Sequence, residues 1–127
     1  MANILVVDNQ KWIVDICSKA LAGTEHNIST TDDVESVMQN VLMFKPDVVI
    51  LNLYLKHGAI GWDVLLDIKM QNPNLPVLIF TAHDKCLYDF RLFHADGYVI
   101  KGCFAHEDAR NKIAGALKQR QAQPGHA

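Results

Sequence analysis

The sequence has few cysteines, and none of them has the spacing that binds a metal or cross-links a small domain. Cys17, Cys86 and Cys103 are odd in number and scattered, and no Cys-x-x-Cys pair occurs. Such a set supports neither a zinc site nor a disulfide framework. We therefore expect small, buried or partly buried thiols in a reducing compartment.

Long apolar runs and an excess of one charge are also missing. The apolar runs are four to six residues long, far below the ~20 residues that span a bilayer. The formal net charge is −2, which gives no broad attraction to nucleic acid or to an anionic membrane. The start of the chain enters a predicted strand at once and shows no signal-peptide pattern. These absences predict a cytoplasmic protein that binds neither nucleic acid nor membranes.

The sequence does contain an alternation of short apolar segments with segments of helical spacing. Strands are predicted at 3–7, 26–31, 48–51, 77–80 and 98–100, and helices at about 10–22, 32–44, 62–71, 86–93 and 105–119. Five such β–α units indicate one α/β domain whose parallel sheet is covered by helices on both faces. We place this domain at 1–121 and a polar C-terminal tail at 122–127, and we expect the chain to fray from residue 121 onward.

Four of these elements carry finer signals. The second strand has one aliphatic residue, Ile28, and so suits an exposed edge of the sheet. Asp32 and Glu35 resemble a capping box at the start of the second helix. The apolar stripe of the third helix includes Met70, which is therefore expected to be buried. The fourth helix has a poor apolar face because Arg91 interrupts its stripe.

Four polar residues follow predicted strands. Asp8 follows the first strand, Asn52 the third, Thr81 the fourth and Lys101 the fifth. Because the carboxyl ends of parallel strands meet at one edge, we expect these residues in a single crevice, where open α/β sheets bind their ligands. Asn52 is the most informative of them, since its amide is uncharged and its nitrogen is a poor nucleophile.

These residues and their neighbours resemble the receiver domain of two-component response regulators, the CheY-like family. The matching segments are 4–8 with its acidic end, 46–53 at the strand that carries the phosphoacceptor, Thr81-Ala82 at the switch hydroxyl, and 98–101 at the aromatic switch and the lysine. The resemblance covers nearly the whole chain. It implies a doubly wound, flavodoxin-like three-layer sandwich with five strands in the order 2-1-3-4-5 and five helices.

The resemblance also implies a mechanism. In a family receiver the aspartate of the third strand takes a phosphoryl group from a histidine of a partner kinase. Magnesium is held by that aspartate and by the acids after the first strand. By resemblance, Lys101 is the phosphate-binding lysine, Thr81 and Ala82 lie at the switch hydroxyl, and Tyr98 is the aromatic switch.

The chain departs from this pattern at three positions. The acceptor position holds Asn52, and the usual second acid after the first strand is replaced by Asn9, so Asp8 stands alone. Gly102 follows Lys101 where the family usually has proline. No acyl phosphate can form on an amide, and a magnesium site based on Asp8 is expected to be weak or absent. We expect no other cofactor.

The remaining crevice residues have a simple structural interpretation. Asp8 and Lys101 can form an ion pair, with Asn52 hydrogen-bonded between them. Replacing acids by amides relieves the repulsion within the usual group of carboxylates, so this crevice needs no ion. The histidines of the sequence lack the spacing of a metal site, so we expect them to be solvated.

The leading hypothesis is a pseudo-receiver, a protein-interaction module that is not an enzyme and acts without phosphorylation. It would bind a histidine kinase, a phosphotransfer protein, an output protein or a second copy through the face formed by 86–93, 98–100 and 105–119. The alternative is a phosphorylatable receiver in which Asn52 is an introduced substitution for the acceptor aspartate. A small flavin-binding or hydrolase-like enzyme is disfavoured, because the loop after the first strand lacks glycine and no Gly-x-Ser-x-Gly motif occurs.

Overall fold

The structure is a computed structural model that describes residues 2–8, 11–21, 26–53, 61–82, 89–100, 102 and 105–123. For Trp12, Ala20 and Phe90 it describes the backbone alone. Lys101 of the predicted crevice and Asn9, which follows Asp8, lie outside the described residues, and what we expect of their side chains stays a prediction.

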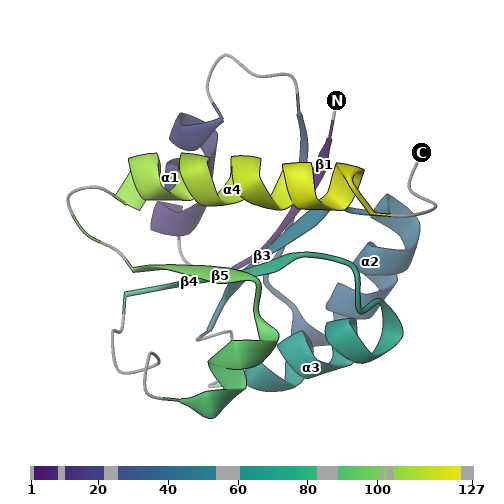
Figure 1. The fold of residues 1–127 in the computed structure, drawn as a ribbon. Helices are drawn as coiled ribbons and strands as arrows, with labels where there is room; N and C mark the ends of the chain where they lie inside the picture. Colours follow the sequence, from purple (N-terminus) through teal and green to yellow (C-terminus); the bar gives the residue numbers. More distant parts are fainter. Residues whose placement is uncertain are drawn as a thin grey trace.

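Five parallel strands form one sheet in the order β2-β1-β3-β4-β5, as predicted (Figure 1). The strands are β1 (Asn3–Val7), β2 (Asn27–Thr31), β3 (Val48–Asn52), β4 (Val77–Thr81) and β5 (Gly97–Ile100). Every residue of β3 and β4 is buried, because continuous apolar runs are covered on both faces of the sheet. β2 lies at one edge, where Ile28 is 40% exposed, as its composition predicted.

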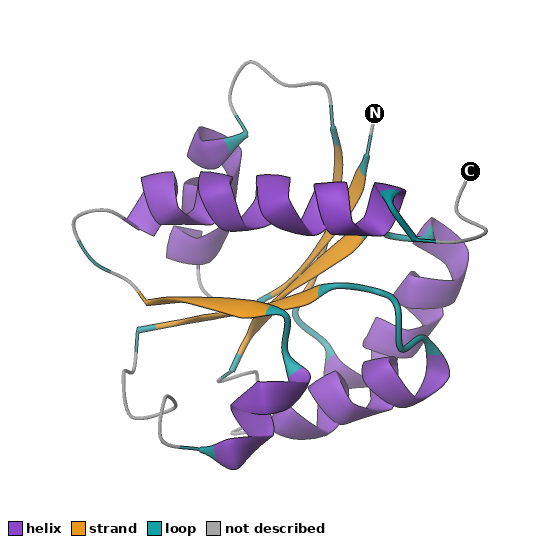
Figure 2. Cartoon of the chain, viewed as in Figure 1, coloured by secondary structure: helices purple, strands orange, loops and turns teal. Residues whose placement is uncertain are grey.

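Helices cover both faces of this sheet (Figure 2). They are α1 (Lys11–Ala20), α2 (Val37–Phe44), α3 (Trp62–Gln71) and α4 (Ala105–Gln121). Side chains alternate along β1, β3 and β4 and therefore pack into two apolar clusters, one on each face of the sheet. Leu5 and Val7 of β1 pack with α2 and α3, whereas Ile4 and Val6 pack with α1 and α4. This arrangement confirms the predicted three-layer fold.

The predicted fourth helix is corrected in type. The described part of the chain contains four α-helices, and a 3-10 turn, η4 (Phe90–His94), lies where a fifth was expected. Asp89 caps this turn by accepting a hydrogen bond from the Arg91 amide at 2.9 Å, and it pairs with the Arg91 guanidinium at 2.6 Å. Arg91 is thus held in a local ion pair, which explains why no apolar helical face continues through it. Residues 86–88 of that prediction lie outside the described residues.

The capping residue before the second helix is one position later than predicted, and α2 itself begins at Val37 and not near residue 32. A 3-10 turn, η1 (Val34–Ser36), precedes the helix, and Asp33 rather than Asp32 provides the cap. Asp33 accepts a hydrogen bond from the Glu35 amide at 3.1 Å. Both aspartates offer the same acceptor, so the sequence alone did not distinguish between them.

Two further expectations fail at the ends of helices. Met70 is 81% exposed, and Ile68 takes the buried position on α3 instead. α4 extends to Gln121, two residues beyond the predicted end of this helix, and Gln123 donates a hydrogen bond to the carbonyl of Asn74. The extra contact fixes the chain as far as residue 123, and residues 124–127 lie outside the described part.

Candidate functional site

Three of the four predicted crevice residues lie at the carboxyl edge of the sheet. Asp8 directly follows β1, Asn52 is the last residue of β3, and Thr81 is the last residue of β4. β1 and β3 are neighbours, and so are β3 and β4. Asp8, Asn52 and Thr81 are 6%, 2% and 0% exposed, so these polar groups are almost completely withdrawn from water.

Asn52 and Asp8 are hydrogen-bonded to one another inside this crevice. Asn52 Nδ2 donates to Asp8 Oδ1 at 2.9 Å, and the bond is buried. An ionised carboxylate can only accept hydrogen bonds, so the amide must present its nitrogen and not its oxygen to Asp8. The predicted hydrogen bond between the amide and the carboxylate is thus present. It offsets part of the free energy that burying the Asp8 charge costs.

This arrangement limits the chemistry of the site. A carboxylate oxygen at position 52 would be a nucleophile, but the amide offers none. The described residues offer a magnesium ion a poor set of ligands, because Asp8 is the one crevice carboxylate among them and its Oδ1 already accepts the Asn52 amide. No cluster of three or more metal-ligating side chains occurs among the residues that the structure describes.

Gly61 lies directly against the end of β3, next to Asn52. The sequence analysis did not identify this close approach. A Cβ atom at this position would lie 3.0 Å from the main-chain oxygen of Asn52 and 3.3 Å from the Leu51 side chain. The Gly61 amide donates to the Leu53 carbonyl at 2.6 Å. Glycine therefore lets α3 begin directly against the end of β3.

Besides Thr81, two residues are matched to the family switch, and they belong to the last two strands of the sheet or follow directly after them. Ala82 follows β4 and is exposed. Tyr98 is 38% exposed on β5, and the Lys112 ammonium of α4 lies 5.6 Å from the centre of its ring. This cation–π contact favours an outward position of the ring over the face of α4.

A second aromatic residue near the crevice is tied to η4. Trp62 opens α3 and is 4% exposed, and the Arg91 guanidinium lies 5.1 Å from the centre of its ring. The hydrogen bonds from Arg91 hold the pKa of Asp89 down at about 2. Arg91 thus connects η4 to the start of α3, which is the element that follows the acceptor-like strand.

Cys17 of α1 is a buried thiol on the face of the sheet that α1 and α4 cover. It is 1% exposed and belongs to the apolar cluster formed with α1 and α4. Burial, and to a smaller extent the nearby charge of Asp8, raises the pKa of its thiol to about 12. The thiol is therefore protonated and structural, as expected for the cysteines of this chain.

Known proteins resemble this chain in both sequence and fold. The response regulator receiver domain profile matches residues 4–114. TcrX of Mycobacterium tuberculosis, a probable transcriptional regulatory protein, is 38% identical over 81 residues, which are 64% of this chain and 34% of TcrX. The response regulator SaeR of Staphylococcus aureus is 29% identical over 105 residues, or 80% of this chain and 44% of SaeR. The chain thus spans less than half the length of these curated relatives.

Solved structures agree with these matches. The response regulator TrrA of Thermotoga maritima, crystallised with Mg(2+)-BeF, has a TM-score of 0.81 and 26% identity, covering 92% of this chain and all of TrrA. TrrA crystallised with the histidine kinase ThkA gives a TM-score of 0.79. As for membranes, no described helix combines the length and apolar character that a crossing requires. The profile match over most of its length shows that this chain belongs to the response regulator receiver domain family of two-component signalling.

Proposed function

We propose that this chain is a pseudo-receiver, a signalling domain that binds partner proteins without taking a phosphoryl group. The observation that supports it best is the buried hydrogen bond from Asn52 to Asp8. An amide occupies the position of the phosphoacceptor, and its nitrogen is engaged with the neighbouring acid. Phosphoryl transfer to this position needs a carboxylate oxygen as the nucleophile. The domain would therefore signal through binding, and we expect no enzymatic activity.

Magnesium is expected to bind weakly or not at all. With amides at positions 52 and 9, Asp8 is the remaining candidate ligand, and it already accepts the Asn52 hydrogen bond. Two unit charges about 4 Å apart near a protein surface attract by roughly 4 kcal/mol. Two missing carboxylates thus remove most of the attraction that a family receiver offers to the ion. We expect no other cofactor.

The face formed by η4, β5 and α4 is the proposed partner surface. Phe93 of η4 is 90% exposed, and Tyr98 of β5 lies beside Lys112 of α4. Exposed aromatic side chains of this kind are frequent anchors at protein interfaces. The complex of TrrA with the kinase ThkA supports a partner of the signalling class: a histidine kinase, a phosphotransfer protein, an output protein or a second copy. We expect binding in the cytoplasm, without nucleic acid or membrane.

A phosphodonor assay tests the proposal. We would incubate the protein with acetyl phosphate and magnesium and measure its intact mass, with the Asn52→Asp variant treated in parallel. The proposal expects no mass gain for the wild-type chain. A stable phosphoryl adduct that maps to Asp8, Thr81 or another crevice residue of the wild-type chain would overturn it.

The same variant separates the proposal from its alternative. If Asn52 is an introduced substitution in an otherwise competent receiver, Asn52→Asp should bind magnesium and take the phosphoryl group. If the crevice has lost this chemistry more broadly, the variant should bind magnesium poorly and stay unlabelled, because position 9 also lacks its acid. The residue encoded at codon 52 of the natural gene decides between an introduced change and a native one.

A further inference from the structure

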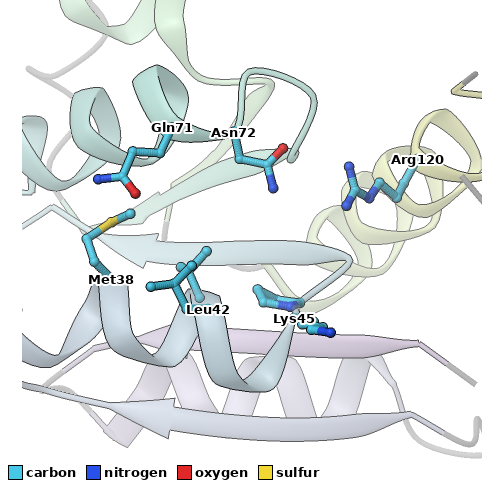
Figure 3. A pocket seen from close by; sticks show the side chains of 8 residues that line it. Met38, Leu42, Lys45, Gln71, Asn72 and Arg120 are labelled. Atoms are coloured by element: carbon cyan, nitrogen blue, oxygen red, sulfur yellow. The ribbon is translucent and has the colours of Figure 1, made fainter. Parts of the chain in front are cut away.

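The structure contains a hollow at the end of the sheet opposite to Asn52. It has a volume of about 320 Å³ and lies where the C-terminal ends of α2, α3 and α4 come together (Figure 3). Pro46, which lines it, precedes β3, whereas Asn52 ends that strand. At roughly 3.3 Å for each strand residue, the two sites are about 20 Å apart. The hollow is thus separate from the crevice, and none of its described lining residues belongs to η4 or β5.

The walls of this hollow differ in chemistry. Met38 and Leu42 of α2 form an apolar wall, and Gln71 at the end of α3 faces them (Figure 3). Lys45 and Arg120 lie toward the other end of the hollow. None of the described lining residues is acidic. The hollow therefore suits a group that joins an apolar side chain to a negative charge.

Both cations keep capacity for such a charge. Lys45 forms no ion pair with any residue that the structure describes. Arg120 Nη1 donates to Gln123 Oε1 at 3.0 Å and to the Asn74 carbonyl at 3.4 Å, whereas its Nη2 makes no hydrogen bond to a residue that the structure describes. A partner's carboxylate that lies between the two side chains would accept charge-assisted hydrogen bonds from Lys45 Nζ and Arg120 Nη2.

The apolar surface continues beyond the hollow. α2, with the sequence Val-Met-Gln-Asn-Val-Leu-Met-Phe, has no charged residue. Leu42 and Met43 in its last turn are 65% and 78% exposed, and Met70 in the last turn of α3 is 81% exposed. A small molecule that fills the hollow would leave such side chains in water, whereas a protein segment can cover them as well. Methionine adapts readily to such contacts.

We propose that the ends of α2 and α3 form a second protein-binding surface, which takes an acidic and apolar segment of a partner. An aliphatic or aromatic side chain of the partner enters the hollow against Met38 and Leu42. A neighbouring carboxylate of the partner lies between Lys45 and Arg120. The charge complementarity selects acidic segments, and the exposed side chains at the rim supply the buried area. This proposal does not depend on whether Asn52 excludes phosphorylation.

A peptide selection followed by mapping tests this surface. A phage-displayed library of random peptides would be selected on the immobilised full chain, and the best peptide would be synthesised and titrated into 15N-labelled protein. We expect enriched peptides that combine aspartate or glutamate with large apolar residues. Their binding should shift the amide signals at the ends of α2 and α3. Enrichment of non-acidic peptides, no enrichment, or shifts confined to η4 and β5 would each overturn the proposal.

Matched variants make the result specific. Lys45→Gln and Leu42→Ser should each weaken the peptide about tenfold, whereas Lys19→Gln on α1 and Phe93→Ser on η4 should leave it unchanged. All four positions are exposed or lie at helix ends, so the fold should persist, and circular dichroism would check it. Equal weakening by the control variants would contradict the proposal. A dimer that sedimentation detects for the wild-type chain but not for Leu42→Ser would also contradict the proposal, because the hollow would then bind a second copy of this chain.

Discussion

At the scale of single residues, position 52 decides whether the crevice holds one negative charge or two. The Asn52 amide donates to Asp8 in a space almost closed to water. An aspartate at position 52 would instead face Asp8 as a like charge, which raises the pKa of such a pair in the folded protein. In the unfolded chain both acids would titrate near their ordinary values. The folded state would then lose stability as the pH rises above about 4.

We therefore predict that Asn52→Asp lowers the free energy of unfolding by about 1–3 kcal/mol at neutral pH. The deficit should shrink as the pH falls toward about 4, because the pair takes up a proton. Urea unfolding at several pH values measures this directly. The exchanged variant, Asp8→Asn with Asn52→Asp, restores one acid and one amide and should recover much of the loss. A deficit that does not change with pH would contradict the electrostatic interpretation.

The buried thiol leads to a second prediction at this scale. Burial raises the pKa of Cys17 to about 12 from an ordinary value of 9.0, so the reactive thiolate is scarce at neutral pH. Iodoacetamide should leave Cys17 unmodified in the native protein and modify it once guanidinium unfolds the chain. Peptide mapping by mass spectrometry gives the readout. Since the unfolded thiol ionises first, folding stability should decrease as the pH rises above about 9.

At the scale of elements, the sequence allowed good prediction of the strands and poorer prediction of the helix ends. The observed bounds of β1 agree with the predicted ones. A continuous apolar run is typical of a buried parallel strand, and the polar residues on either side of the run mark where the strand begins and ends. The meeting of Asp8 and Asn52 was predictable for the same reason, since both lie at carboxyl ends of neighbouring parallel strands.

Other features depend on contacts that no local pattern contains. Asp33 caps η1 although Asp32 offers the same acceptor, and Met70 faces solvent although it continues an apolar stripe. The role of Gly61 depends on how closely α3 approaches the end of β3. The positions of the Asn9 and Lys101 side chains stay predictions from the family resemblance.

Gly61 gives the prediction at this scale. Gly61→Ala would bring a Cβ atom to 3.0 Å from the Asn52 main-chain oxygen, so β3 or α3 must shift, and we expect a loss of about 1–3 kcal/mol. Gly115→Ala is the matched control, because nothing lies within 4 Å of its Cβ position on α4. That change should stabilise the helix by about 0.5–1 kcal/mol. Thermal unfolding of both variants measures the contrast, and equal effects would disprove the close approach.

At the scale of the whole molecule, two apolar clusters share one sheet. Leu65 of α3 and Ile113 of α4 are almost fully buried on opposite faces. Because β1, β3, β4 and β5 contribute side chains to both clusters, neither face can lose its packing without loosening the strands of the other. A domain of this size is therefore expected to unfold in a single cooperative step.

We predict that Leu65→Ala and Ile113→Ala each destabilise the chain by about 2–5 kcal/mol through loss of packing and creation of a cavity. In both variants, tryptophan fluorescence and far-ultraviolet circular dichroism should give the same urea midpoint. A variant in which the two signals separate would show that one face unfolds alone.

Lys45 has a consequence for any attempt to make this domain more robust. It ends α2 with φ at 52°, the one non-glycine residue with positive φ in the described ranges. Glycine adopts this conformation more easily, by about 1 kcal/mol. A designer who optimised only thermal tolerance would therefore replace the lysine with glycine. That change would also remove one of the two positive charges from the proposed binding surface at the ends of α2 and α3.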